Sequence, residues 1–90
     1  MGGRDDNWTT GAEDLATEST VMRQVLAAHP VLLTAAELIR EIAGEDPGFA
    51  ERDAIERALR DLGGIGLLHL QGDLVLPTRA ALHFNELMER

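Results

Sequence analysis

The stretch DAIERALRDLGGIGLLHLQGDLVLP, residues 53–77, changes its hydrophobic period halfway along and decides which fold the chain can adopt. In its first ten residues the apolar side chains recur at helical spacing. This stripe consists of Ile55, Ala58, Leu59 and Leu62. After a pair of glycines the spacing becomes alternate, and a Gln-Gly-Asp turn separates two short apolar arms. We therefore expect a helix at 53–62 followed by a β-hairpin over residues 68–77.

Two helices are predicted before this stretch. An apolar arc at helical spacing indicates a helix at 17–28, which should end before Pro30 because proline disfavours helical conformation in the preceding residue. The capping-box spacing of Thr10 and Glu13 leaves an earlier start open. Farther on, Thr34 and Glu37 have the spacing of a capping box. That box predicts a second helix at 35–43.

Two later helix boundaries are also suggested by the sequence. The helix that contains residues 53–62 begins either at Pro47, as a first helical residue, or at Asp53, as an N-cap. Thr78 can cap a last helix, whose apolar arc we expect to belong to the core. This arc consists of Ala80, Ala81, Phe84, Leu87 and Met88. Leu82 lies opposite that arc, so we expect it to be exposed and a candidate contact in a homodimer.

The length and composition limit the class of protein. The chain has 90 residues, enough for one modest core, and no cysteine, which excludes a disulfide scaffold and a thiolate zinc site. We expect residues 17–90 to form the domain, whereas residues 1–16 form a polar tail whose order the sequence leaves open. No apolar run approaches the ~18 residues that would span a bilayer, and no signal peptide is visible. The expected location is the cytoplasm, away from any membrane.

The charge balance bears on possible partners. There are 16 acidic residues against 8 basic ones, all of them arginine, and the net charge is −8. Such a chain repels nucleic acid at long range. Because the Debye length is only about 8 Å at physiological salt, a local cluster of arginines can still attract a phosphate.

The order of these elements resembles the winged helix-turn-helix fold, and in particular the small regulators related to the multiple-antibiotic-resistance repressor family. The resemblance covers about residues 17–90. It rests on the entry into the second helix at 33–34, the helix at 53–62, the glycine-rich lead into the hairpin at 63–68 and the exit at 77–82. It implies an α+β, mostly helical fold with a three-helix core, a short β-hairpin wing and a C-terminal helix.

The same resemblance implies a DNA-binding transcriptional regulator, with the helix at 53–62 as the recognition helix in the major groove and the wing against phosphates. If DNA is bound, the contacts fall to five arginines. These are Arg40, Arg52, Arg57, Arg60 and Arg79.

The residues themselves also support an alternative, a winged-helix domain that binds proteins and no DNA. The outward arc of the third helix alternates arginines with carboxylates, and Asp53–Arg57 and Glu56–Arg60 have the i, i+4 spacing of stabilising ion pairs. The tip of the wing carries no lysine or arginine, so it offers little affinity for phosphate. The sequence leaves both functions open, and a homodimer is compatible with either.

Residues for catalysis or metal binding are not grouped in the sequence. His29, His69 and His83 lie on three different elements without ligand spacing, and Ser19 has no histidine and aspartate partners in a recognisable pattern. The carboxylates fall on outward arcs, where nothing would separate their pKa values. We therefore expect no enzyme, no metal and no cofactor.

Overall fold

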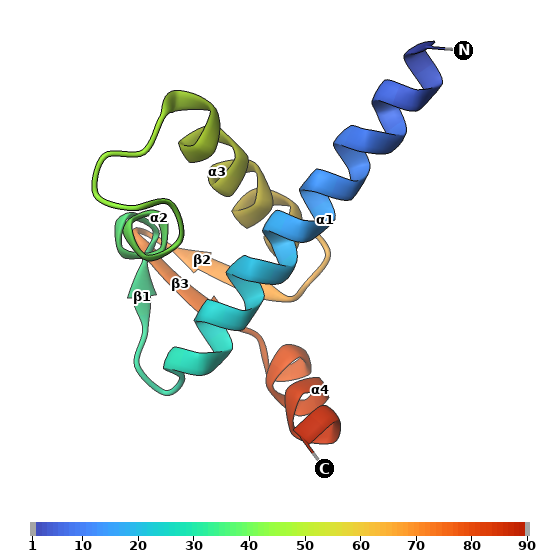
Figure 1. Cartoon of the computed structure of the whole chain (residues 1–90). Helices are drawn as coiled ribbons and strands as arrows, with labels where there is room; N and C mark the ends of the chain where they lie inside the picture. The colour runs from blue at the N-terminus through green and yellow to red at the C-terminus, as the bar shows by residue number, and fades with distance from the viewer. Residues whose placement is uncertain (1, 90) are drawn as a thin grey trace.

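The computed structural model describes the backbone of residues 2–89 and the side chains of residues 11–89. Along the chain (Figure 1) the elements are α1 (Gly2–Ala28), β1 (Leu33–Thr34), α2 (Ala35–Ala43), α3 (Phe49–Gly64), β2 (Leu68–Gln71), β3 (Leu74–Pro77) and α4 (Arg79–Glu89). The fold is α+β and mostly helical, as predicted.

The strands form one antiparallel sheet in the order β1-β3-β2. The predicted hairpin is confirmed as β2 and β3, and β1 adds a third strand on the other side of β3. Val75 lies opposite both Leu33 and Leu70 in this register and is almost fully buried. The centre of the sheet therefore forms one wall of the core.

The helices α1, α2 and α3 supply the rest of the core. The buried hydrophobic side chains of this cluster are Val21, Val25, Leu38, Ile55, Ala58, Leu59, Leu62, Leu68 and Val75. All four residues of the predicted stripe at 53–62 belong to it. The helical spacing therefore identified the buried side of α3 correctly.

The expected start of the first helix at residue 17 is wrong, because α1 begins at Gly2 and includes nearly all of the stretch expected as a tail. No proline interrupts residues 2–20, and Gly11 in a helix costs only about 1 kcal/mol relative to alanine. Figure 1 shows the N-terminal half of α1 extending beyond the other elements.

The capping box of α2 is confirmed. The Thr34 hydroxyl accepts a hydrogen bond from the Glu37 N–H at 3.1 Å, and the Thr34 N–H donates to Glu37 Oε1 at 2.8 Å. The Thr34 backbone N–H, followed by its side chain, holds the pKa of Glu37 below its ordinary value. These bonds set the start of the helix, and Gly44, whose N–H donates to the Arg40 carbonyl, ends it at residue 43, as predicted.

Both expected starts of α3 are wrong, because the helix begins at Phe49 with Gly48 as its N-cap. The carboxylate of Glu51 accepts a hydrogen bond from the Gly48 N–H at 3.2 Å. This bond gives a partner to a backbone N–H group at the helix start that would otherwise have none.

The orientation of α4 differs from the expected one. The Thr78 hydroxyl accepts a hydrogen bond from the Ala81 N–H at 3.2 Å and donates to the Gly66 carbonyl at 2.8 Å. These bonds place Ala81 against the body of the molecule, where it is buried. Leu82 is half-buried, contrary to expectation, and the large side chains of the expected core arc are exposed.

Candidate interaction surfaces

The outer side of α3 carries arginines and carboxylates in close alternation. Arg52, Arg57 and Arg60 are all exposed. Within the same helix lie four carboxylates, which are Glu51, Asp53, Glu56 and Asp61. The formal charge of the helix is therefore −1, and its surface is not a positive strip.

Arg57 is directed towards α1. Its Nη2 lies 3.6 Å from Asp14 Oδ1, and the two side chains are 45% and 39% exposed. Among the described side chains this is the single ion pair within 4.0 Å, so the expected pairs Asp53–Arg57 and Glu56–Arg60 do not form at that distance. Asp14 was not predicted as a partner of Arg57, because the sequence places it in a tail instead of on a helix beside α3.

A second carboxylate of α1 also faces α3. Burial, followed by the charges of Asp61 and Asp14, raises the pKa of Glu18 above its ordinary value of 4.5. Burial is the largest cause of this increase, and the two neighbouring carboxylates add to it. A phosphate approaching the α1 side of α3 would meet the same repulsion.

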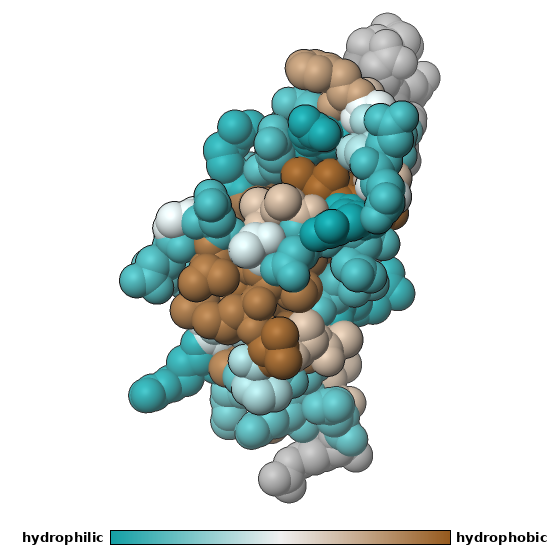
Figure 2. Space-filling model, turned by 90° about the vertical axis from the view of Figure 1, so that its left-hand side faces the viewer, coloured by the Kyte–Doolittle hydropathy of each residue, from teal (hydrophilic) through white to brown (hydrophobic). Residues whose placement is uncertain are grey.

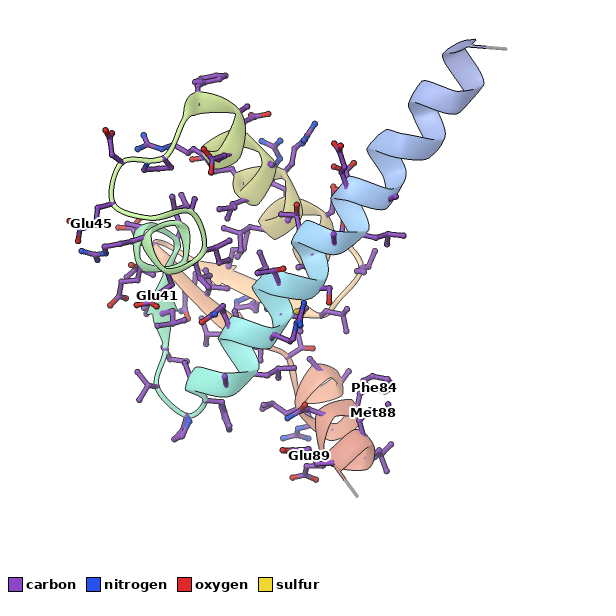
Figure 3. All side chains as sticks on the ribbon, in the orientation of Figure 1. Glu41, Glu45, Phe84, Met88 and Glu89 are labelled. Carbon is purple, nitrogen blue, oxygen red and sulfur yellow. The ribbon has the colours of Figure 1, made fainter. Side chains whose placement is uncertain are left out.

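The structure brings Arg40 and Arg52 together at a shallow hollow of about 530 Å³ between α2 and α3. Glu45 and Glu56 line the same hollow, so its formal charges cancel. Figure 3 shows Glu41 and Glu45 on the outer side of this region. Arg57 and Arg79 do not line the hollow.

The tip of the β2–β3 hairpin is tied to α2. The Asp73 carbonyl accepts a hydrogen bond from the Ala35 N–H at 2.9 Å. The tip, residues 71–73, contains no basic side chain. Arg79 is exposed at the start of α4, after the hairpin has ended.

The exposed side of α4 carries a continuous hydrophobic surface, which we call the α4 apolar face. It consists of Phe84, Leu87 and Met88, which are 61%, 55% and 69% exposed. Figure 3 shows Phe84 and Met88 pointing away from the rest of the molecule. Helical spacing predicted this stripe, but its assignment to the core is wrong.

A second hydrophobic area lies on the side of the molecule that carries α2 and β1 (Figure 2). In this part of the chain the exposed hydrophobic side chains include Val31, Leu32 and Leu74. Leu74 is paired with Thr34 across the sheet, so it lies close to the short strand that follows Leu32.

The titratable side chains of the described residues do not gather into a metal site. His29, His69 and His83 are all exposed. Within residues 11–89 no three histidine, aspartate or glutamate side chains are placed to hold a metal ion. No helix in the described part of the chain has both the length and the hydrophobicity required to cross a bilayer.

Comparisons with known proteins add no relative. A scan against protein-family models, a search of curated proteins and a search of solved structures each gave no match to this chain.

Proposed function

We propose that this chain is a protein-interaction domain of winged-helix type that binds its partner through the α4 apolar face. The observation that carries the proposal is the exposure of Phe84, Leu87 and Met88 on one side of a helix. Single exposed hydrophobic residues are common, but a contiguous exposed apolar patch is typical of an interaction site.

The winged-helix assignment is supported by the order and pairing of the elements. Two helices, α2 and α3, follow one another through a short connection, and the β2–β3 hairpin comes directly after them. In this interpretation α3 occupies the position of a recognition helix and the hairpin that of the wing. The position alone says nothing about the partner, because one fold serves many functions.

The charges favour a protein over DNA as the partner. Phosphate contacts supply most of the sequence-independent affinity for DNA, and they require lysines or arginines that are free to reach the backbone. Here Arg57 is paired with Asp14, Arg40 and Arg52 share a hollow with two glutamates, and the hairpin tip has no cation. A net charge of −8 adds long-range repulsion.

A second candidate function is DNA binding by α3. It is favoured by the exposure of Arg52 and Arg60 and by the position of Arg40 on the neighbouring helix, since arginine is the most frequent reader of guanine. In that case Arg52, Arg57 and Arg60 would contact the duplex in the major groove, and Arg40 and Arg79 would contact phosphates.

A duplex titration separates the two functions. We expect no saturable binding of a labelled mixed-sequence duplex, measured by fluorescence anisotropy at about 50 mM salt, a concentration that favours phosphate contacts. Saturable binding that Arg57→Ala/Arg60→Ala abolishes would establish the second function instead. Circular dichroism of that variant checks that its fold is intact.

A partner experiment tests the first function directly. Chemical crosslinking in the source cells should trap a protein adduct of the wild-type chain, and Phe84→Ser/Leu87→Ser should remove it. Arg52→Ala/Arg60→Ala is the matched control and should retain the adduct. Loss of the adduct in the arginine variant alone would contradict the assignment of the contact to α4.

A further inference from the structure

We propose that a hollow between α1, α2 and α3 binds a cationic amphipathic helix of another protein. The hollow has a volume of about 260 Å³ and lies where the middle of α1 meets the end of α2 and the start of α3. None of the residues that line it belongs to α4. The inference therefore goes beyond the proposed function and does not depend on it.

The floor of the hollow is the edge of the hydrophobic core. Ile55 is only 2% exposed, and Ile42 and Ala43 are half-buried side chains packed against the core cluster. A large apolar side chain that enters the hollow would therefore contact the core directly. Its burial would raise the affinity of a partner at least about tenfold.

The wall that α1 supplies is less polar than its sequence indicates. The Thr17 hydroxyl donates a hydrogen bond to the Glu13 carbonyl, and the Thr20 hydroxyl donates to the Ala16 carbonyl, both at 3.0 Å. Because both hydroxyls are bonded within α1, the threonines contribute mainly their methyl groups to the hollow. Together with Ala16, they make this wall apolar.

The size of the hollow favours a protein side chain over a small molecule. Sites for drug-sized ligands have volumes of about 300–1,000 Å³, and this hollow is smaller. Its walls are the sides of helices, and an amphipathic helix lying in such a groove is a recurring mode of recognition. Because α1 extends beyond the other elements (Figure 1), a helix lying along α1 has room to continue past the hollow.

The charges around the hollow favour a cationic partner. None of the lining side chains is basic, and Glu51 lines the hollow and is exposed. Glu13 is also exposed and lies three residues before Ala16, on the same side of α1. Among the described side chains neither carboxylate has an ion pair within 4.0 Å. Lysines or arginines beside the entering apolar side chain would pair with both, and the net charge of −8 attracts them at longer range.

A peptide titration tests the inference. The probe is a synthetic peptide of about 18 residues, long enough to form a helix, with leucine at helical spacing and lysine elsewhere. We expect saturable binding in isothermal titration calorimetry, with the largest amide shifts in heteronuclear NMR spectra at Thr20, Ala43 and Ala54. A matched peptide with glutamate in place of lysine should bind at least about tenfold more weakly. No saturable binding, shifts confined to other elements, or equal affinity for the two peptides overturns the inference.

Filling the hollow tests whether it is the contact. Ala16→Trp places a large side chain on its wall and should raise the Kd of the lysine peptide at least about tenfold. The matched control is Leu15→Trp, because Leu15 is the neighbouring residue, is 68% exposed and does not line the hollow. It should stay within about twofold of wild type. Circular dichroism checks both folds, and equal effects of the two changes overturn the inference.

Neutralising the two carboxylates tests the charge of the partner. Glu13→Gln/Glu51→Gln should raise the Kd of the lysine peptide about threefold to tenfold and reduce its dependence on NaCl. Glutamine at residue 51 can still accept the hydrogen bond from the Gly48 N–H, so the start of α3 is preserved. An unchanged Kd with unchanged salt dependence overturns the assignment of a cationic partner.

This inference and the proposed function fail separately. Phe84→Ser/Leu87→Ser disrupts the α4 apolar face and should leave the affinity for the lysine peptide within about twofold of wild type. If that variant loses the peptide, the peptide binds α4, which overturns the inference and leaves the proposed function standing. A chain that binds the peptide in the hollow but gives no α4-dependent adduct in cells loses the proposed function and keeps the inference.

Discussion

Individual residues fix the core and the local electrostatics of this small domain. Leu38 is fully buried at the middle of α2, between the other helices and the sheet. Glu18 is a half-buried carboxylate on α1 whose neighbours on α3 include Asp61. The two residues have opposite effects on stability, and each can be tested by one substitution.

Replacing Leu38 by alanine should destabilise the chain by about 2–5 kcal/mol, because the change leaves a cavity among residues that cannot all move in. Urea denaturation followed by circular dichroism measures the loss. Leu15→Ala is the control, since Leu15 is exposed on α1, and it should change the stability by less than about 0.5 kcal/mol. Equal losses in the two variants would contradict the position of Leu38 in the core.

Glu18→Gln should stabilise the chain at neutral pH by at most about 0.5 kcal/mol. Because its pKa is raised on folding, the folded state binds the Glu18 proton more tightly than the unfolded state. The contribution of Glu18 to stability therefore falls as pH rises through the window above 4.5, and the Gln variant lacks that loss. Thermal unfolding between pH 4 and 7 measures the difference, which should vanish at the acidic end. A difference independent of pH would contradict this assignment.

At the scale of elements, the sequence correctly predicts the helix boundaries and turns that depend on residues close together in the chain. Thr34 and Glu37 bond to each other, so the start of α2 follows from four consecutive positions. The turn between β2 and β3 is equally local. The rotation of α4 depends on a distant contact, so periodicity alone does not determine it.

For the candidate surfaces too, the sequence predicts the local pattern of residues but not the contacts between distant parts of the chain. The sequence identified the exposed arginines of α3 and the apolar stripe of α4, but it could not show that Asp14 lies beside Arg57. It also assigned the stripe to the core, because spacing identifies a hydrophobic side without showing what covers that side. The contact between Thr78 and Gly66, twelve residues apart, settles which side of α4 faces the body.

Thr78→Val should cost about 1–2 kcal/mol, because the α4 cap and the bond to the Gly66 carbonyl are lost together. The conservative variant Thr78→Ser keeps the hydroxyl and should cost less than half as much. Both are measured by urea denaturation. If valine and serine cost the same, the hydroxyl does not hold α4 in place.

At the scale of the whole molecule, an excess of negative charge opposes the compact state. The chain has twice as many acidic residues as basic ones, and the Arg57–Asp14 pair is long and exposed. Repulsion among the carboxylates should therefore outweigh the small gain from exposed ion pairs.

Raising the NaCl concentration from about 20 to 300 mM should stabilise the chain by about 0.5–1 kcal/mol, which is an increase of roughly 4 °C in the midpoint of thermal unfolding. Glu41→Gln/Glu45→Gln removes two outward carboxylates and should show a smaller gain (Figure 3). Calorimetry measures both. A midpoint that falls with salt would show that attractive pairs dominate.

The projecting N-terminal half of α1 gives the protein an elongated outline of 44 × 32 × 22 Å, with a Cα radius of gyration of 13.9 Å. A compact domain of this length has a radius of about 12 Å. A single copy will therefore diffuse more slowly than its mass implies and will leave a gel-filtration column early, at a volume that calibration with spherical standards assigns to a heavier species. Light scattering, which reports mass independently of shape, will distinguish a protruding rod from a true pair.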